Sequence, residues 1–180
     1  QRRLYKRFLT LPDAIYVRDK FKPCPCGRTM HDGKPMRRGY CCHVTPIELE
    51  ATTGTRAVIW RTFHDGDEAC LRCPHCINLQ VIAKLQKICN HPDLLQVDPG
   101  EKNARKRERV EAFARVLFPE DVLRARGGVV RSTRFDQQHR TEACGKMAAL
   151  EKLLEHLTRR HKVLVFSWSV QTLEILEAFV

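Results

Sequence analysis

Seven cysteines fall between residues 24 and 76, and they constrain the fold more than any other feature of this chain. The segment 22–46 carries seven Pro or Gly residues and little hydrophobic periodicity, which is typical of a loop. Such a loop buries too little apolar surface to form a core of its own, and a bound metal ion would supply the missing stability. The cysteines form two groups, Cys24, Cys26, Cys41 and Cys42, then Cys70, Cys73 and Cys76.

Zinc is the metal that these groups favour. Zn²⁺ takes four ligands in a tetrahedron, with sulfur at about 2.3 Å, and a Cys-x-x-Cys turn presents two sulfurs to one ion. The odd total of nine cysteines and the lack of a secretion signal argue against a disulfide scaffold. We predict a structural zinc held by the first four cysteines. The triad Cys70, Cys73 and Cys76 either completes a second site with His64 or joins the first. The alternative for all seven is reduced thiols.

The chain is basic, and its charge is unevenly distributed. The formal net charge is +11. Residues 1–38 account for +8 of it, with eleven Lys or Arg against three Asp or Glu. A segment of this kind suits a polyanion such as nucleic acid, with a solvated basic face as the alternative. Arg37 and Arg38 are candidate contacts to DNA phosphates. No apolar run approaches the roughly 20 residues that a membrane helix needs, so we predict no membrane partner.

Hydrophobic spacing predicts helices in the first two thirds of the chain. They cover residues 1–11, ended by Pro12, residues 77–89, ended by His91-Pro92, and residues 102–118. Residues 55–63 fit either a short strand or the start of a helix. Residues 124–142 contain a Gly-Gly pair, many charges and few apolar side chains, which indicates a flexible linker.

The last 39 residues change character. An amphipathic helix is expected from Met147 to Leu157, a buried strand from Lys162 to Ser167, and a second helix from Gln171 to Val180. Helix, buried strand and helix in this order are typical of the beginning of a parallel α/β domain.

Three ordered segments carry a resemblance to a known family. They are Gln1 with Leu4-Tyr5, then LQKICNHPDLL from Leu85 to Leu95, then Gly145-Lys146-Met147 with Lys162–Ser167 and Ile175-Leu176-Glu177. In this order they resemble the SWI/SNF-type ATPases of helicase superfamily two. The Cys-x-Cys pair at Cys24 and Cys26, followed by Cys41-Cys42, resembles an insertion in the excision-repair cross-complementing-like branch, which is related to the Cockayne syndrome group B protein.

The resemblance implies an α/β fragment cut from the middle of a longer chain. Residues 1–95 would be the helical protrusion that follows motor lobe one, with the Cys-rich zinc insertion at 22–76. Residues 96–142 would be a basic helix and linker. Residues 143–180 would be the first helix, strand and helix of the C-terminal helicase lobe, which has a RecA-like parallel sheet.

The resemblance also implies a nuclear parent protein that hydrolyses ATP to translocate on double-stranded DNA in DNA repair or chromatin remodelling. Its partners would be duplex DNA, ATP with magnesium, and nucleosomes or repair proteins. This sequence has neither a G-x-x-x-x-G-K-[ST] phosphate loop nor an Asp-Glu-x-His box, and the arginine motif would lie beyond Val180. We therefore predict no catalytic residue and no ATP hydrolysis in this chain alone.

Further DNA contacts are expected around the last predicted strand. Ser167, Ser169 and Gln171 follow the strand end, where parallel α/β sheets bind their ligands, and Ser169 is also a candidate helix cap. Lys146 either contacts DNA or caps a neighbouring helix, and Trp168 either stacks on a base or packs against the lobe. The alternative function is a non-enzymatic, zinc-stabilised module that binds nucleic acid or protein.

Overall fold

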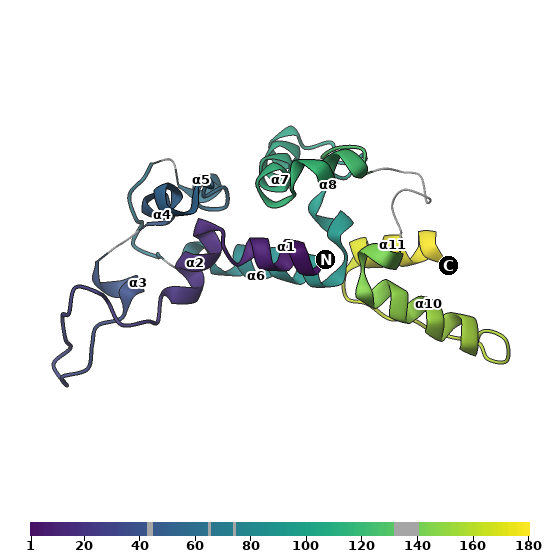
Figure 1. Cartoon of the computed structure of the whole chain (residues 1–180), viewed down its shortest axis with the longest axis horizontal. Coiled ribbons are helices and arrows are strands. Elements are labelled where there is room, and N and C mark those ends of the chain that lie inside the picture. The colour runs from purple at the N-terminus through teal and green to yellow at the C-terminus, as the bar shows by residue number, and fades with distance from the viewer. Residues whose placement is uncertain (43–44, 65, 74, 132–140) are drawn as a thin grey trace. The chain divides into compact units, whose positions relative to one another are not determined.

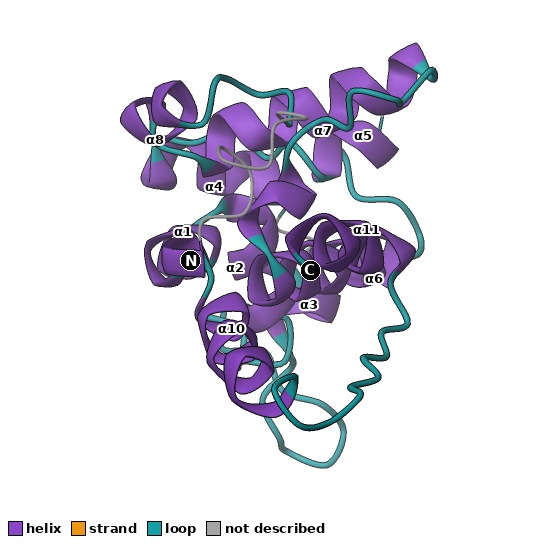
Figure 2. Cartoon of the chain, turned by 90° about the vertical axis from the view of Figure 1, so that its right-hand side faces the viewer, coloured by secondary structure: helices purple, strands orange, loops and turns teal. Residues whose placement is uncertain are grey.

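The computed structural model describes the whole chain except residues 43–44, 65, 74 and 132–140 (Figure 1). Two compact units make up the chain. One is Lys6–Leu85, and the other joins Gln1–Tyr5 to Gln86–Val180. Helices and loops account for the described residues, and no named strand occurs among them (Figure 2). None of the described helices is both long enough and apolar enough to cross a bilayer.

Short helices joined by loops build the Lys6–Leu85 unit. They are α1 (Arg2–Phe8), α2 (Pro12–Asp19), α3 (Arg38–Cys41), α4 (Pro46–Thr53), α5 (Trp60–Phe63) and α6 (His75–Asn90), of which α1 and α6 continue into the other unit. The helix predicted over 77–89 is confirmed as α6. For residues 55–63, the helix is the alternative that forms, as α5.

Pro12 begins a helix rather than ending one. α1 stops at Phe8, and Pro12 lies in the first turn of α2. Proline has no backbone N–H and a φ angle fixed at about −65°, so the first turn of a helix is the position that tolerates it best. The prediction of one helix over residues 1–11, ended by Pro12, is therefore wrong at its C-terminal end.

A buried carboxylate organises the core of the Lys6–Leu85 unit. Asp13 on α2 is 1% exposed and accepts the backbone N–H groups of Ile59 and Trp60, at 3.2 and 2.8 Å. These bonds satisfy N–H groups at the start of α5, where no neighbouring turn can do so. The Trp60 side chain is fully buried, and Tyr16 packs edge-on against it with 5.7 Å between ring centroids. Asp13 thus fixes α5 on α2.

The second unit contains the longer predicted helices. Its elements after α6 are η1 (Pro92–Leu95), α7 (Ala104–Leu117), α8 (Glu120–Ala125), η2 (Thr141–Ala143), α10 (Gly145–Leu157) and α11 (Val170–Phe179). The helices predicted over 102–118 and from Met147 to Leu157 are confirmed as α7 and α10. One core cluster holds Leu94, Cys144, Met147 and Ile175, with Leu176 and Phe179 packed against it. Both helices of the C-terminal segment therefore pack on the residues that follow α6.

The strand predicted from Lys162 to Ser167 is not formed. This segment has no regular secondary structure, and Leu164 and Phe166 are 82% and 88% exposed. A strand of a parallel sheet needs neighbouring strands to satisfy its backbone groups, and the described part of the chain offers no named strand as a neighbour. The prediction of a buried strand is wrong for this structure. Of the expected helix-strand-helix unit, only the helices α10 and α11 are present among the described residues.

The expected linker at 124–142 is partly held in place. Val97 and Val130 form an isolated parallel bridge, and the Arg126 side chain forms an ion pair with the buried Asp93. The residues up to 131 are therefore tied to the segment that follows α6. Residues 132–140 of the expected linker lie outside the described residues, and its last two residues begin η2.

Candidate metal centres

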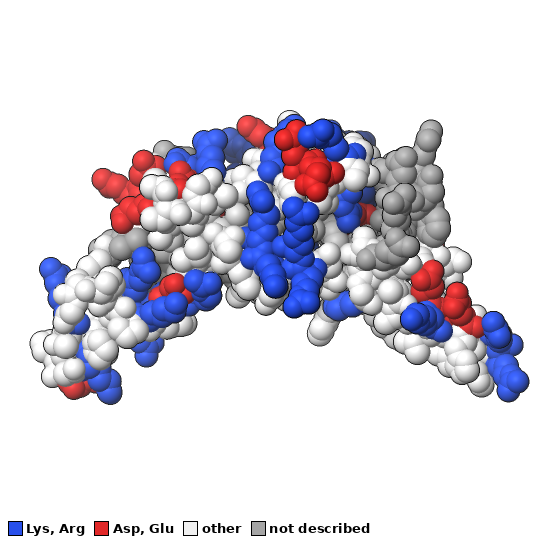
Figure 3. All heavy atoms as spheres, viewed as in Figure 1, with Lys and Arg blue, Asp and Glu red and all other residues white. Residues whose placement is uncertain are grey.

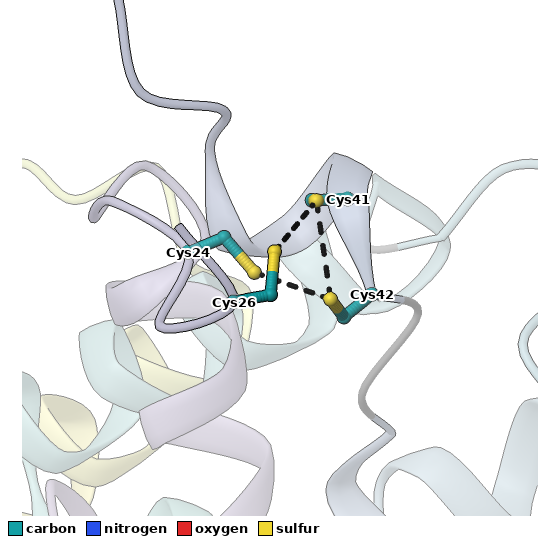
Figure 4. Close-up of side chains that lie close together, drawn as sticks. All are labelled: Cys24, Cys26, Cys41 and Cys42. Carbon is teal, nitrogen blue, oxygen red and sulfur yellow. Dashed lines mark hydrogen bonds between the residues drawn. The ribbon is translucent and has the colours of Figure 1, made fainter. Parts of the chain in front are cut away.

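The first four predicted cysteines meet at one point (Figure 4). The Sγ atoms of Cys24 and Cys42 are 3.3 Å apart, and those of Cys26 and Cys41 are 3.4 Å apart. All four sulfurs lie within 4.8 Å of one another, and none is in a disulfide. A zinc–sulfur distance of about 2.3 Å requires sulfur–sulfur edges of about 3.8 Å in a tetrahedron, so this arrangement could hold a metal ion. We call these four residues cluster one.

Two chain segments position cluster one. Cys24 and Cys26 lie in a loop whose N-terminal arm pairs with its C-terminal arm, where the Cys24 N–H donates to the Met36 carbonyl at 2.7 Å. Cys41 and Cys42 end the short helix α3. Gly39 on α3 lies so close to Lys20 that an added Cβ would be 2.8 Å from the Lys20 Cβ. A glycine is therefore required where α3 meets the start of the loop.

The thiols of cluster one differ widely in acidity. The Arg28 backbone N–H and the neighbouring thiols lower the pKa of Cys26 to about 6. The neighbouring thiols raise the pKa of Cys42 to about 12. This spread follows from crowding, because ionising one thiol makes ionisation of its neighbours harder. A divalent cation would remove that repulsion, and thiolates are the form in which cysteine binds metals.

The second triad of cysteines forms a separate site with His64. The Nε2 atom of His64 is 3.4 Å from the Cys73 Sγ and 3.6 Å from the Cys76 Sγ. The Sγ atoms of Cys70 and Cys76 lie 3.5 and 3.3 Å from that of Cys73. All four ligand atoms lie within 4.8 Å of one another. Of the two alternatives for the triad, the structure thus forms the site with His64, which we call cluster two.

The core of the unit orients His64. Its ring stacks on Trp60, with 3.7 Å between centroids and 6° between planes, and its Nδ1 lies 3.2 Å from the Trp60 carbonyl oxygen. A carbonyl oxygen only accepts, so Nδ1 carries the proton and Nε2 presents its lone pair to the three sulfurs. A histidine that is held by a carbonyl group in this way is typical of metal ligands. Asp13, through Trp60, therefore supports cluster two.

The thiols of cluster two also divide into acidic and weakly acidic groups. Burial acts to raise the pKa of Cys70, but its contacts with the Arg72 N–H, His64 and the neighbouring thiols outweigh burial and lower that pKa to about 6. Burial raises the pKa of Cys73 well above its usual range. In cluster two Cys70 is exposed and the other three residues are half-buried, whereas cluster one combines the buried Cys24 with the exposed Cys26 and Cys42.

The predicted DNA contacts of the C-terminal segment mostly bond within the protein. Lys146 donates from Nζ to the side-chain Oδ1 of Asn90, the last residue of α6, at 3.0 Å. Gln171 accepts a bond from Lys87 at 2.9 Å, and the Ser169 Oγ accepts the Thr172 N–H and caps α11. The Ser167 Oγ accepts the Ser169 N–H at 3.3 Å. Trp168 is fully exposed and does not pack.

Gln1, which begins the first of the three family-like segments, has a structural role in the second unit. The Gln1 Nε2 donates to the carbonyl oxygens of Ile88 and Cys89, both at 2.9 Å. Its Oε1 accepts the Gly145 N–H at 3.2 Å. Gln1 therefore joins the last turn of α6 to the first turn of α10, and Cys144 adds a bond from its Sγ to the Asn90 carbonyl at 3.0 Å. Sequence reasoning gave no role to Cys144.

Arg37 and Arg38 come just before Cys41 and Cys42 of cluster one in the sequence. Arg37 is exposed, and its guanidinium lies 5.3 Å from the centroid of the Phe21 ring. The Arg38 N–H donates to the Lys22 carbonyl at 2.8 Å. The supporting residues Asp13 and Trp60 were missed, because no spacing in the sequence places them beside a cysteine group.

Comparison with known proteins gives relatives of much greater length. The chain is 35% identical over 182 residues to Switch 2 of Arabidopsis thaliana and 27% identical over 183 residues to DNA excision repair protein ERCC-6-like 2 of Mus musculus. Each alignment covers 99% of this chain. Chromodomain-helicase-DNA-binding protein 6 of Homo sapiens is 32% identical over 107 residues, or 59% of the chain. The chain is homologous to SWI/SNF-type ATPases.

The homology concerns a part of those proteins only. The chain spans 19% of the length of Switch 2, 10% of ERCC-6-like 2 and 3% of the chromodomain protein. It is thus a fragment relative to them. No model of a protein family matches the chain, and no solved structure matches it. Because the alignments to Switch 2 and ERCC-6-like 2 cover 99% of the chain, the similarity extends beyond the three motif segments and includes the Cys-rich segment.

Proposed function

We propose that this chain is the inter-lobe segment of a nuclear, ATP-dependent translocase on double-stranded DNA that acts in DNA repair or chromatin remodelling. The homology that covers 99% of the chain in two relatives carries the proposal, and one of those relatives is named a DNA excision repair protein. ATP and magnesium would bind to the parent outside this segment, since the phosphate loop and the acidic box are absent here. The segment would contribute structure between the lobes and contact with DNA.

In this proposal each metal cluster holds one zinc ion. Cluster one supplies four thiolates, and cluster two supplies three thiolates and the His64 Nε2, both of which are ligand sets typical of structural zinc. Zinc, when bound, supplies a cross-link between chain segments. The residues of the chain do the rest: Trp60 orients His64, and the loop pairing places Cys24 and Cys26 opposite Cys41 and Cys42. These contacts support two zinc ions, whereas the sequence alone predicted one zinc ion at the first four cysteines and left two alternatives for the triad.

DNA contact in this proposal is independent of sequence. Arg2, Arg3 and Lys6 on α1 are exposed, and Figure 3 shows Lys and Arg side chains gathered on one face over α1. Arg37 adds exposed charge beside cluster one. Phosphate contacts of this kind release counterions from the DNA, and this release becomes less favourable as the salt concentration rises. The affinity therefore falls with a log–log slope of about −0.9 per neutralised phosphate. We expect Lys146, Ser167, Ser169 and Gln171 to reach DNA only if their internal bonds open.

A second candidate function rests on the Lys6–Leu85 unit. This compact unit contains both metal clusters, each with a full set of four ligand atoms. A zinc-stabilised module that binds nucleic acid or protein, without any motor, would have this organisation. The flanking coding sequence separates the two candidates, because a translocase requires a phosphate loop upstream and an arginine motif downstream.

The decisive experiment expresses the chain within its full reading frame and alone. ATP hydrolysis is measured for both proteins, with and without duplex DNA. Turnover that duplex DNA stimulates in the longer protein, and no turnover above buffer in the 180-residue chain, is the expected result. A longer protein with no phosphate loop and no turnover would leave the binding module as the function. Elemental analysis of the same preparations, purified without chelator, should give about two zinc ions per chain.

A further inference from the structure

The loop that carries cluster one is strongly basic. Residues 20–42, here called the 20–42 loop, contain six Lys or Arg and one acidic residue, Asp32. Figure 3 shows basic side chains at several points of its surface. The Lys34 Nζ pairs with Asp32 at 2.9 Å, and Arg28 and Arg37 are exposed. The loop therefore presents a net charge of +5 to a partner, more than half of the excess found in residues 1–38.

Aromatic rings lie exposed within this charge. Phe21 is 55% exposed and Tyr40 is 40% exposed, and their ring centroids are 6.5 Å apart at an angle of 39°. We call the two rings of Phe21 and Tyr40 the platform. Two cations border it, since the Lys20 Nζ and the Arg37 Cζ lie 4.8 and 5.3 Å from the Phe21 centroid. An exposed phenylalanine gains nothing from solvent, so its place beside two cations and a second exposed ring points to a partner with flat faces and negative charge.

The platform is held in position before any partner binds. The Gly39 N–H donates to the Lys20 carbonyl at 3.0 Å, and the Arg38 N–H to the Lys22 carbonyl at 2.8 Å, which closes the loop directly on either side of Phe21. The hydroxyl of Tyr40 is hydrogen-bonded to the His75 Nε2 at 3.0 Å. Fixed rings lose little conformational entropy on binding, which favours their use as anchors.

The tip of the loop adds an apolar hollow. An open hollow of about 500 Å³ is lined by Thr29, Met30, His31, Asp32 and Met36. Met30 is 41% exposed, and methionine adapts to irregular flat surfaces better than branched side chains do. The loop thus offers unpaired apolar surface at its base and at its tip, with basic side chains between them.

We propose that the 20–42 loop is a binding surface for single-stranded nucleic acid, on which unpaired bases stack against Phe21 and Tyr40 while Arg28 and Arg37 contact the phosphates. In a duplex the base faces are stacked on one another, so only a single strand can use the exposed rings. The inference goes beyond translocation on duplex DNA, and it rests on the proposed zinc in cluster one to the extent that zinc would hold Cys24 and Cys26 against Cys41 and Cys42.

The test uses the whole 180-residue chain and labelled oligonucleotides in a fluorescence anisotropy titration. The probes are short oligo(dT), short oligo(U) and a blunt duplex of the same length, at one salt concentration. We expect the single strands to bind more tightly than the duplex. Phe21→Leu removes the ring but keeps the apolar bulk, and it should weaken single-strand binding about fivefold or more without changing duplex binding. Phe21→Tyr keeps the ring and should retain binding.

Charge variants separate stacking from simple attraction. Arg37→Ala should weaken binding of every probe, whereas Arg105→Ala, which removes an exposed cation of α7 outside the loop, should change single-strand binding less. The oligo(dT) and oligo(U) probes show whether the 2′-hydroxyl contributes. Equal affinity for duplex and single strand, an unchanged affinity in Phe21→Leu, or full competition by polyglutamate would each overturn the proposal.

Zinc content measured on the same samples distinguishes the two proposals. A chain without zinc that still binds single strands through Phe21 would refute the zinc sites and leave this inference standing. A chain with two zinc ions whose single-strand affinity does not depend on Phe21 would refute the inference alone. Phe21 supplies no ligand atom to either cluster, so its variants keep both sites intact.

Discussion

The hydroxyl oxygen of Tyr40 lies 3.0 Å from the Nε2 atom of His75, and each residue directly precedes a cysteine of a different cluster. Tyr40 precedes Cys41 of cluster one, and His75 precedes Cys76 of cluster two. The two rings also face each other, with centroids 6.0 Å apart. One hydrogen bond thus connects the residues that precede a cysteine in each candidate metal centre.

Tyr40→Phe should uncouple the clusters without changing the number of bound metal ions. The bond is exposed, so its loss is expected to cost about 0.5 kcal/mol, or roughly a twofold change in a rate. Chelator-driven zinc release, followed with a metallochromic dye, measures this in a double-mutant cycle with Cys73→Ser, which disables cluster two. Disabling cluster two should speed release from cluster one only when Tyr40 is present. Tyr5→Phe, a matched change at an exposed tyrosine on α1, should have no effect, and strict additivity would contradict the coupling.

The sequence predicted the grouping of the cysteines well because its signal is local. Cys70, Cys73 and Cys76 follow one another at intervals of three residues, and this spacing alone groups them. The sequence left open whether the triad forms a site with His64 or joins the first four cysteines, because the distance between His64 and the triad depends on how α5 packs. The roles of Asp13 and Tyr40 come from contacts between distant segments, which no spacing reveals.

The C-terminal segment shows the opposite case. The apolar run from Lys162 to Ser167 is typical of a buried strand, but a strand forms only where other strands accept its hydrogen bonds. The helices α10 and α11 depend on bonds within each helix, so the sequence predicted them correctly. Pro12 is a related case, because a proline can either end a helix or lie in the first turn of one. In this structure Pro12 lies in the first turn of α2.

Asp13→Asn should destabilise the Lys6–Leu85 unit and weaken cluster two. The carboxylate accepts two backbone N–H groups in a buried position, and an amide offers only one accepting atom, so one N–H loses its partner. The free energy of unfolding, measured with urea on the zinc-loaded chain, should fall by about 1–3 kcal/mol. Because Trp60 stacks on His64, zinc release from cluster two should also accelerate. Asp67→Asn, at an exposed carboxylate, should stay within about 0.5 kcal/mol of the wild type.

The second unit should become less stable as pH rises from about 4 to 6, because Asp93 loses a proton in this range. Burial raises the pKa of Asp93 to about 6 from 3.8, although the Arg126 guanidinium acts to lower it. Between these values the folded chain holds a proton that the unfolded chain has released. The free energy of unfolding therefore falls as pH rises through this window, by up to about 3 kcal/mol, and does not fall further above it.

Unfolding of the wild type and of Asp93→Asn at each pH isolates this contribution. The variant cannot titrate at this position, and the metal clusters lie in the other unit and are the same in both proteins. The difference in unfolding free energy should favour the wild type most at about pH 4 and least at about pH 6. A difference that stays constant, or that grows as pH rises, would show that the Arg126 ion pair dominates over burial.

Trp168 should report that the apolar segment before α11 is solvated. The chain has two tryptophans, and Trp60 is fully buried whereas Trp168 is fully exposed. Subtracting the emission spectrum of Trp168→Phe from that of the wild type gives the emission of Trp168 alone. It should be red-shifted and readily quenched by acrylamide, while the remaining Trp60 emission should be blue-shifted and shielded. Phe166→Ala should change the stability of the 180-residue chain by less than about 0.5 kcal/mol, because the side chain is already in water. A shielded Trp168, together with a loss of several kcal/mol in Phe166→Ala, would instead mean that this segment is buried in solution, as the sequence pattern predicts for a strand.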